Sequence, residues 1–268
     1  VHDAELVSRV RRLTESGGGQ LDADTPVSAG SLRAAQCAAG ASVEAVRAVL
    51  DGRVAQAYAL VRPPGHHATR RTAKGFCVFC NVAIAAAWAL DVGGLRRVAI
   101  VDFDVHHGDG VVDAFADDDR VLYLSTHEHP LYPFSGVPEY VGSGRSTGLC
   151  VNIALPPGSG DAALDRALDQ VITPALRRFR PELVLLSAGY DAHWRDPLAN
   201  LRVSVAGFGR AVTALLALAD ELCAGRMALT LEGGYDLPAL SHGVAATFAA
   251  LLGRRYRDPL GPSPEQGC

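Results

Sequence analysis

Several features that would assign the chain to another class of protein are missing from its sequence. It has 268 residues, a formal net charge of −4 with acids and bases mixed along the chain, and a single lysine, Lys74. No basic stripe or tail indicates a nucleic-acid partner. No apolar run reaches the roughly 18 residues that a membrane span requires, and no signal peptide is recognisable. We therefore expect a cytoplasmic protein, and the excess of arginine over lysine is typical of a bacterial coding sequence.

The spacing of the cysteines does not indicate a disulfide framework or a complete metal-binding motif. One C-x-x-C pair occurs, CVFC at 77–80, and no second pair follows it, so a zinc ribbon or redox motif is a minor interpretation. In a chain of this length, scattered cysteines are typical of small buried side chains rather than of disulfides. The six positions are Cys37, Cys77, Cys80, Cys150, Cys223 and Cys268.

Apolar runs alternate with segments of helical periodicity, without a linker or an internal repeat. The runs are continuously apolar, which indicates strands buried on both faces of a parallel sheet. We predict a single α/β domain over residues 1–255, an open parallel β-sheet flanked by helices on both faces, followed by a tail at 256–268. The expected strands are 57–61, 97–103, 120–125, 150–155, 183–188 and 227–232. The expected helices are 3–16, 31–51, 78–92, 109–117, 161–179, 205–224 and 238–253.

Unusual polar residues follow five of these strands directly. Because ligands bind outside the carboxyl ends of the strands in open parallel sheets, these loops predict one site at a common edge. Agreement among separate loops is stronger support than any single motif. The segments are RPPGHH (62–67), DVHHGDG (104–110), STHEH (125–129), GYDAH (189–193) and GGYD (233–236).

Three residues in these loops have the chemistry of a metal site. Asp104 and His106 stand two apart at a strand end, where an extended backbone directs both side chains to the same side. Asp191 on another loop completes a set of two carboxylates and one imidazole, which suits Zn²⁺ with a fourth position open for water or substrate. The competing interpretation is that Asp104 caps the next helix and His106 packs locally. It is weaker because the loops converge.

Two further features complete a catalytic pattern. His66 and His67 follow a rigid Pro-Pro-Gly turn, and one of them can act as general base and then general acid if Asp102 or Asp109 orients its ring. Tyr235 follows two glycines, so its phenol could donate to a developing oxyanion. Solvated histidines in a surface turn and a half-buried tyrosine are the alternatives. No nucleophile motif such as G-x-S-x-G occurs, and the set predicts metal-assisted hydrolysis of a carbonyl compound such as an amide.

Together the motifs resemble those of one family. RPPGHH, GFCVFCN, VDFDVHHGDG, LYLSTHE, LYPFSG, SAGYDAH and EGGYD occur in the order seen in the zinc-dependent histone deacetylase family, which includes bacterial histone deacetylase-like amidohydrolases and acetylpolyamine amidohydrolases. The resemblance runs from about residue 1 to about residue 255, and the double proline and EGGY are most similar to the class II branch. It implies a zinc-dependent enzyme that removes acetyl groups from the ε-amine of acetyl-lysine in proteins or peptides.

The resemblance implies roles for the residues singled out above. The zinc ligands match Asp104, His106 and Asp191, and the proton shuttle matches His67, which Asp109 orients. The other catalytic matches are His66, an electrostatic partner backed by Asp102, and Tyr235, which polarises the acyl carbonyl. A structural potassium ion beside the zinc matches, mostly through backbone oxygens, Asp102, Asp104, His106, Ser125 and Thr126.

Positions around the acyl-lysine tunnel also match the family. Gly75 matches the backbone carbonyl that holds the scissile amide, and Phe76 with Tyr132 match the tunnel walls. Asp24 resembles the rim aspartate that grips the substrate backbone, and Gly234 belongs to the same substrate-binding set.

The chain departs from the family pattern in three places. The family usually begins with another strand and a segment containing His, Pro, Glu and Arg upstream of Val1, so we expect this sheet to lack an N-terminal strand. LYPFSG replaces the more usual Pro-Gly-Thr-Gly ending, which we expect to reshape the rim. Cys80 stands where asparagine is common, which we expect to be a packing change.

The substrate follows less directly from the sequence. Leu198 matches a glutamate of polyamine-specific members, so an apolar residue there favours acetyl-lysine. An acidic rim of Asp24, Glu128 and Glu139 would favour cations, so an acetylated polyamine is the alternative substrate. Two more distant alternatives are an arginase-like binuclear metallohydrolase and a catalytically silent binder of acylated lysine.

Overall fold

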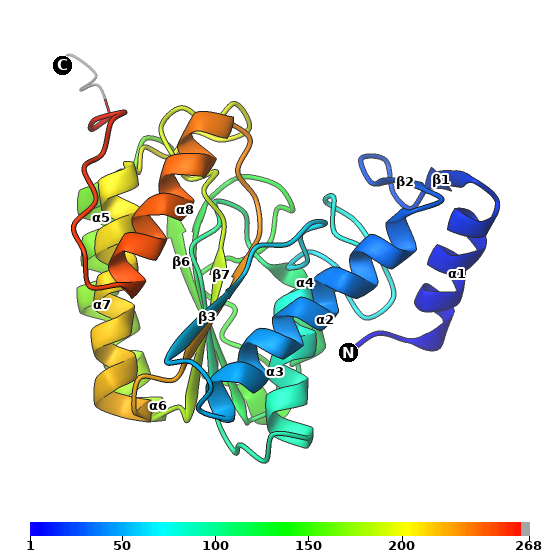
Figure 1. Cartoon of the computed structure of the whole chain (residues 1–268), viewed down its shortest axis with the longest axis horizontal. Coiled ribbons are helices and arrows are strands. Elements are labelled where there is room, and N and C mark those ends of the chain that lie inside the picture. Colours follow the sequence, from blue (N-terminus) through cyan, green and yellow to red (C-terminus); the bar gives the residue numbers. More distant parts are fainter. Residues whose placement is uncertain (264–268) are drawn as a thin grey trace.

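A six-stranded parallel sheet lies at the centre of the computed structural model, which describes residues 1–263 (Figure 1). The strand order is β3-β8-β7-β4-β5-β6, and every neighbouring pair is parallel. The predicted fold class is confirmed, and each expected strand is present. The strands are β3 (Gln56–Ala59), β4 (Val98–Asp102), β5 (Val121–Glu128), β6 (Cys150–Leu155), β7 (Leu183–Ala188) and β8 (Met227–Leu231).

Two hydrophobic cores pack against opposite faces of the sheet. Successive side chains of a strand point to opposite faces, so in β4 Val98 and Ile100 enter one core while Ala99 and Val101 enter the other. Every residue of β4 and β7 is buried. This double burial explains why these runs are continuously apolar up to the point where the polar loops begin.

Helices cover both faces of the sheet (Figure 1). One layer contains α2 (Ser31–Leu50), α3 (Asn81–Asp91) and α4 (Asp109–Ala114). The other contains α5 (Asp161–Ala167), α6 (Thr173–Phe179), α7 (Val205–Cys223) and α8 (Leu237–Leu251). The helix expected at 161–179 is interrupted by a π-helical turn at Leu168–Ile172. A short 3₁₀ helix spans Gly144–Ser146.

A small N-terminal unit packs beside α2 (Figure 1). It contains α1 (Ala4–Glu15), which the sequence predicts, and an antiparallel pair, β1 (Gly18–Gln20) and β2 (Pro26–Ser28), which it does not. Its apolar side chains form a third cluster with the segment that precedes α3. The expectation that an upstream strand is missing stays a prediction, as do the domain bounds.

The strand order reverses between β4 and β7. From β4 the chain proceeds to β5 and β6 on one side, whereas β7 and β8 follow on the other side. Ligands of open parallel sheets bind where the order reverses, outside the carboxyl ends of the strands. The loops after β4 and β7 carry the three predicted metal ligands, so the topology brings them to this point.

The cysteines and the tail agree in part with expectation. The five described cysteines are free thiols, and all but the exposed Cys37 are buried, whereas Cys268 lies outside the described residues. Residues 256–263 of the predicted tail contain neither helix nor strand, and 264–268 lie outside the described part. Among the described helices, none combines the length and the apolar character needed to cross a membrane.

Candidate metal centre and active site

Asp104, His106 and Asp191 converge on one buried point. His106 Nδ1 lies 3.1 Å from Asp104 Oδ1 and 3.2 Å from Asp191 Oδ2, and one ligand atom from each residue lies within 4.8 Å of the others. The second oxygen of each carboxylate is held by the backbone. Asp104 Oδ2 accepts from Gly233 N at 2.8 Å, and Asp191 Oδ1 accepts from Val105 N at 2.9 Å. The remaining oxygens are therefore directed at a common position.

The electrostatics of this cluster favour a positive charge at its centre. Burial and the neighbouring Asp104 carboxylate raise the pKa of Asp191 to about 7. Burial lowers the pKa of His106, but its contacts with the carboxylates of Asp104 and Asp191 outweigh burial and raise that pKa to about 10. Asp191 Oδ2 has no hydrogen-bond partner of good geometry among the described residues. A Cβ at Gly189 or Gly233 would collide with these carboxylates, so the cradle is closed around them.

Two histidines with separate carboxylate partners lie beside the cluster. His66 Nδ1 lies 3.0 Å from Asp102 Oδ2, and His67 Nδ1 lies 2.9 Å from Asp109 Oδ1. The two rings are 4.1 Å apart between centroids. Burial opposes the charged form of His66, yet the carboxylates of Asp104 and Asp102 raise its pKa. Burial and the neighbouring His66 lower the pKa of His67 to about 4. The pair therefore combines a charged ring with a neutral one that can accept a proton.

Lys74 contacts the carboxylate of the His67–Asp109 pair, and the sequence analysis assigns this lysine no role. Its Nζ donates to Asp109 Oδ2, so one carboxylate receives His67 on one oxygen and an ammonium on the other. Burial raises the pKa of Asp109, but the hydrogen bonds from His67 and Lys74 outweigh burial and lower it. The ionised carboxylate holds the Nδ1 proton of His67 in place.

Of the predicted tunnel residues, Tyr132 and Gly75 lie against His67, and Phe76 lies against Tyr235. The ring of Tyr132 meets that of His67 edge-on at 5.1 Å, and Phe76 meets Tyr235 at 5.7 Å. Burial and the nearby Asp191 raise the pKa of the Tyr235 phenol, which keeps it a proton donor. Gly75 has φ 58°, and a Cβ there would lie 2.6 Å from His67 Cδ2. Only glycine fits this close approach.

The rim is joined to the site by two aspartates. Asp24 is exposed, and its Oδ1 accepts from Gly75 N at 3.2 Å. Leu198 is 45 % exposed, and its backbone N donates to Asp196 Oδ1 at 3.0 Å. The other oxygen of Asp196 accepts from Tyr235 N at 2.7 Å. Asp196, which the sequence did not single out, thus links the turn of Leu198 to that of Tyr235.

The expected acidic rim is wrong at Glu128. This side chain belongs to β5, is buried, and accepts hydrogen bonds from Asn200 N at 2.6 Å and Asn200 Nδ2 at 2.9 Å. Glu128 is therefore a structural carboxylate of the interior, and its side chain does not form part of the exposed rim. Glu139 is exposed, and its place in the rim stays a prediction.

Three of the residues that match a potassium site lie on neighbouring strands, Asp102 at the end of β4 and Ser125 with Thr126 within β5. The other two, Asp104 and His106, lie in the loop after β4. β4 and β5 pair with Asp102 opposite Ser125. Thr126 Oγ1 donates to the Asp102 carbonyl at 3.4 Å, and Ser125 Oγ is hydrogen-bonded to His127 Nδ1 at 2.8 Å. These oxygen atoms are buried next to the Asp-His-Asp cluster.

Glu232 is the main buried residue of the site that sequence reasoning missed. It lies in the quoted EGGYD motif, and its carboxylate accepts hydrogen bonds from the backbone of Gly65 and His66. Burial raises its pKa to about 7. Two residues further, Gly234 has φ 136°, a conformation that glycine adopts readily, and it turns the chain towards Tyr235.

The fold and the site define the class of the protein as an α/β enzyme whose candidate metal centre lies beside an acid–base pair of histidines. The sequence matches the family described as Histone deacetylase domain over residues 1–251. The chain therefore belongs to the histone deacetylase family, and it is an enzyme that acts on amide bonds.

Named relatives cover nearly all of the chain. The "Probable deacetylase" of Archaeoglobus fulgidus is 40% identical over 269 residues, 99% of this chain and 74% of that protein. The human "Polyamine deacetylase HDAC10" is 41% identical over 275 residues, 98% of this chain but 40% of that protein. A solved structure described as "Crystal Structure of HDA15 HD domain" has a TM-score of 0.89 at 39% identity, and covers 97% of this chain and 73% of that chain.

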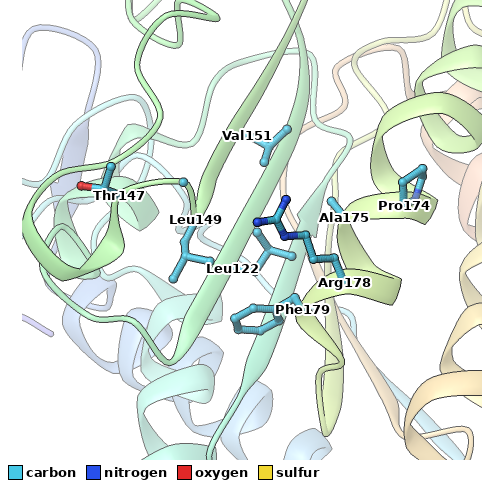
Figure 2. Close-up of a pocket in the computed structure, with 9 residues that line it drawn as sticks. Leu122, Thr147, Leu149, Val151, Pro174, Ala175, Arg178 and Phe179 are labelled. Atoms are coloured by element: carbon cyan, nitrogen blue, oxygen red, sulfur yellow. The ribbon is translucent and has the colours of Figure 1, made fainter.

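A groove that is separate from the predicted site residues lies on another part of the molecule. It has a volume of about 580 Å³ beside the edge strand β6 and is lined by Leu149 and Val151 on one side and Phe179 on the other. Arg178 extends across it (Figure 2). None of the predicted site residues lines this groove, so its size does not identify the reactive centre.

Proposed function

We propose that the protein is a zinc-dependent deacetylase that removes acetyl groups from the ε-amine of acetyl-lysine in proteins or peptides. The observation that carries this proposal is the buried convergence of Asp104, His106 and Asp191 beside His67. Two carboxylates and one imidazole form a donor set that suits Zn²⁺, and one of the carboxylate oxygens, Asp191 Oδ2, has no hydrogen-bond partner among the described residues. When bound there, zinc would supply Lewis acidity towards an acyl carbonyl and a water molecule.

The residues of the chain supply the remaining chemistry. His67 holds its Nδ1 proton against Asp109, so Nε2 accepts a proton from water and later returns it to the leaving amine. Tyr235 donates from its phenol to the oxygen on which negative charge develops. The Gly75 carbonyl accepts the amide N–H of the substrate, while Phe76 and Tyr132 exclude water from its aliphatic chain. His66, held by Asp102, contributes positive charge beside this reaction.

Potassium at Asp102, Asp104, His106, Ser125 and Thr126 is part of the proposal. Its support is the burial of these residues around the point where Asp102 of β4 pairs with Ser125 of β5 and the Thr126 hydroxyl meets the Asp102 carbonyl. A monovalent cation there would offset part of the charge of Asp104. The cytoplasm remains the proposed location, on the sequence grounds given above.

Acetyl-lysine is preferred over an acetylated polyamine for two reasons. Leu198 presents an apolar side chain at the position that resembles a polyamine-selecting glutamate, and Glu128 is withdrawn from the rim. The relative named a polyamine deacetylase keeps that substrate class as the alternative. A binuclear, arginase-like site is not favoured, because the described residues bring together a single group of three or more metal-binding side chains. The presence of His67 and Tyr235 argues against a silent binder.

A paired turnover assay tests the proposal. An acetyl-lysine peptide and an acetylated polyamine are each incubated with the protein, with and without a chelator, and bound metal per chain is counted. We expect hydrolysis of the peptide with the higher kcat/KM, one zinc per chain, and loss of activity on chelation that added Zn²⁺ restores. Higher kcat/KM for the polyamine would transfer the proposal to that substrate, and chelator-insensitive turnover or two metals per chain would overturn it.

A further inference from the structure

A buried carboxylate lies beneath the turn that carries the two histidines. Glu232 Oε2 accepts from Gly65 N at 2.6 Å and from His66 N at 3.1 Å, while Oε1 accepts from Ser187 Oγ at 3.4 Å. The Glu232 residue is 6% exposed. Two successive backbone N–H groups meet one oxygen, Oε2, so a single side chain satisfies two buried donors of the turn.

The same strand end also holds the metal cluster. Glu232 N donates to the Ala188 carbonyl at the end of β7 at 3.1 Å, and the next residue, Gly233, donates from its N to Asp104 Oδ2 at 2.8 Å. Two adjacent residues of one chain segment therefore hold the His turn and a candidate metal ligand. The separation between the proton acceptor and the metal position depends on this segment.

The His turn has little freedom to settle elsewhere. A Cβ at Gly65 would collide with Asn81 N and lie 2.7 Å from the Phe79 carbonyl, so the start of α3 encloses the turn on one side. The His66 carbonyl accepts from Gly110 N at 2.9 Å on another. Glu232 adds a further contact, at the backbone N–H groups of Gly65 and His66, directly before His67.

We propose that Glu232 is a positioning residue that sets the placement of His66 and His67 relative to the metal ligands, an inference that rests on the deacetylase function proposed above. Glu232 acts through the backbone and does not touch substrate. Without its oxygen, two buried N–H groups lose their acceptor and the turn shifts. A displacement of about 1 Å from productive geometry can cost on the order of 10²-fold in rate.

The test compares Glu232→Ala and Glu232→Gln with a matched control. Asp161 is suitable, because its carboxylate also accepts a backbone and a hydroxyl donor, Ser204 N and Ser204 Oγ, each at 2.7 Å, and because it begins α5 and, among the described residues, makes no hydrogen bond to any that is assigned to the site. For each variant, kcat and KM on an acetyl-lysine peptide, bound zinc per chain and Tm are measured.

The expected pattern separates positioning from general destabilisation. Glu232→Ala should lower kcat by about 10- to 100-fold, with KM within about threefold of the original and zinc retained. Glu232→Gln should stay within about fivefold in kcat, because its amide oxygen can still accept both N–H groups and its NH₂ can donate to Ser187 Oγ. Asp161→Ala should lower Tm and leave kcat unchanged.

Several outcomes would overturn the inference. Unchanged kcat in Glu232→Ala, or an equal loss in Glu232→Ala and Glu232→Gln, would contradict it. If Glu232→Ala does not fold, Glu232→Asp replaces it, since the shorter side chain keeps the charge but withdraws the oxygen. A normal kcat in Glu232→Asp would then contradict positioning, and a loss of about tenfold or more would support it. Absence of turnover in the unmodified protein would overturn the proposed function as well, whereas turnover indifferent to Glu232 would overturn this inference alone.

Discussion

Replacement of Asp109 by asparagine should invert the tautomer of His67. The carboxylate accepts on both sides, with Oδ1 2.9 Å from His67 Nδ1 and Oδ2 in contact with Lys74 Nζ. His67 therefore carries its proton on Nδ1 and keeps Nε2 free. An asparagine has one accepting and one donating end, and an ammonium can only donate. The amide should turn its oxygen to Lys74 and its NH₂ to His67, which moves the imidazole proton to Nε2.

The size of the effect follows from this orientation. A hydrogen bond to a charged group contributes about 1.5–3 kcal/mol, so the unproductive orientation is favoured by about 10- to 100-fold. About 1–10% of molecules then keep the productive tautomer. Loss of the carboxylate charge also weakens the imidazolium form, and the equivalent change in a serine-protease triad costs about 10⁴-fold. We expect kcat to fall by about 10²- to 10⁴-fold.

Steady-state kinetics on an acetyl-lysine peptide, with bound zinc counted, would check this. Adding Lys74→Met to Asp109→Asn removes the ammonium, so the amide can turn its oxygen back to His67, and kcat should recover by about tenfold or more. Lys74→Met alone serves as the reference for the double variant. A double variant no faster than Asp109→Asn would refute the orientation argument, and near-normal turnover in Asp109→Asn would refute the role of the carboxylate.

Three further perturbations test the metal and the phenol. Asp191→Asn should lower bound zinc and activity together, because it removes one of two carboxylates that converge on His106; retained zinc stoichiometry would contradict the ligand assignment. Tyr235→Phe should retain zinc and lose about 10²- to 10³-fold in kcat, the scale of one oxyanion donor, so a near-normal rate would exclude the phenol. Zinc at about 100 times its Kd should stabilise the folded chain by about 2.7 kcal/mol over chelated protein, measured as a rise in Tm. An equal Tm in both conditions would argue against a metal at this cluster.

The parts of the site that follow local rules could be predicted from the sequence. Asp104 and His106 stand two apart after a continuously apolar run, and strand alternation brings them to one side. Asp191 needs one more rule, that the loops after parallel strands meet at one edge. Both rules depend on the backbone alone, so no knowledge of side-chain packing was needed.

The parts that depend on distant partners could not be predicted. Glu232 meets Gly65 across 167 positions of the sequence, and nothing in either segment encodes that contact. The sequence places Glu128 in STHEH, one of the loops expected at the common edge, and so in an acidic rim. In the structure β5 continues to this residue and Asn200 satisfies its carboxylate. The strands β1 and β2 have three residues each, too few for any periodicity.

Backbone N–H groups offset only part of the negative charge of the buried Asp104 and Asp191 carboxylates. The remaining negative charge favours a cation at this site. Asp104 Oδ2 accepts from Gly233 N at 2.8 Å and Asp191 Oδ1 from Val105 N at 2.9 Å. These amides approach closely because Gly233 has no Cβ that would collide with Asp191 Oδ2. Backbone dipoles carry no net charge, however, and His66 and His106 together can offset at most two of the three carboxylates of Asp102, Asp104 and Asp191. A buried pair of like charges must either bind a proton or bind a cation. The second outcome leaves both carboxylates ionised and His106 neutral, which is the protonation state that metal ligation requires.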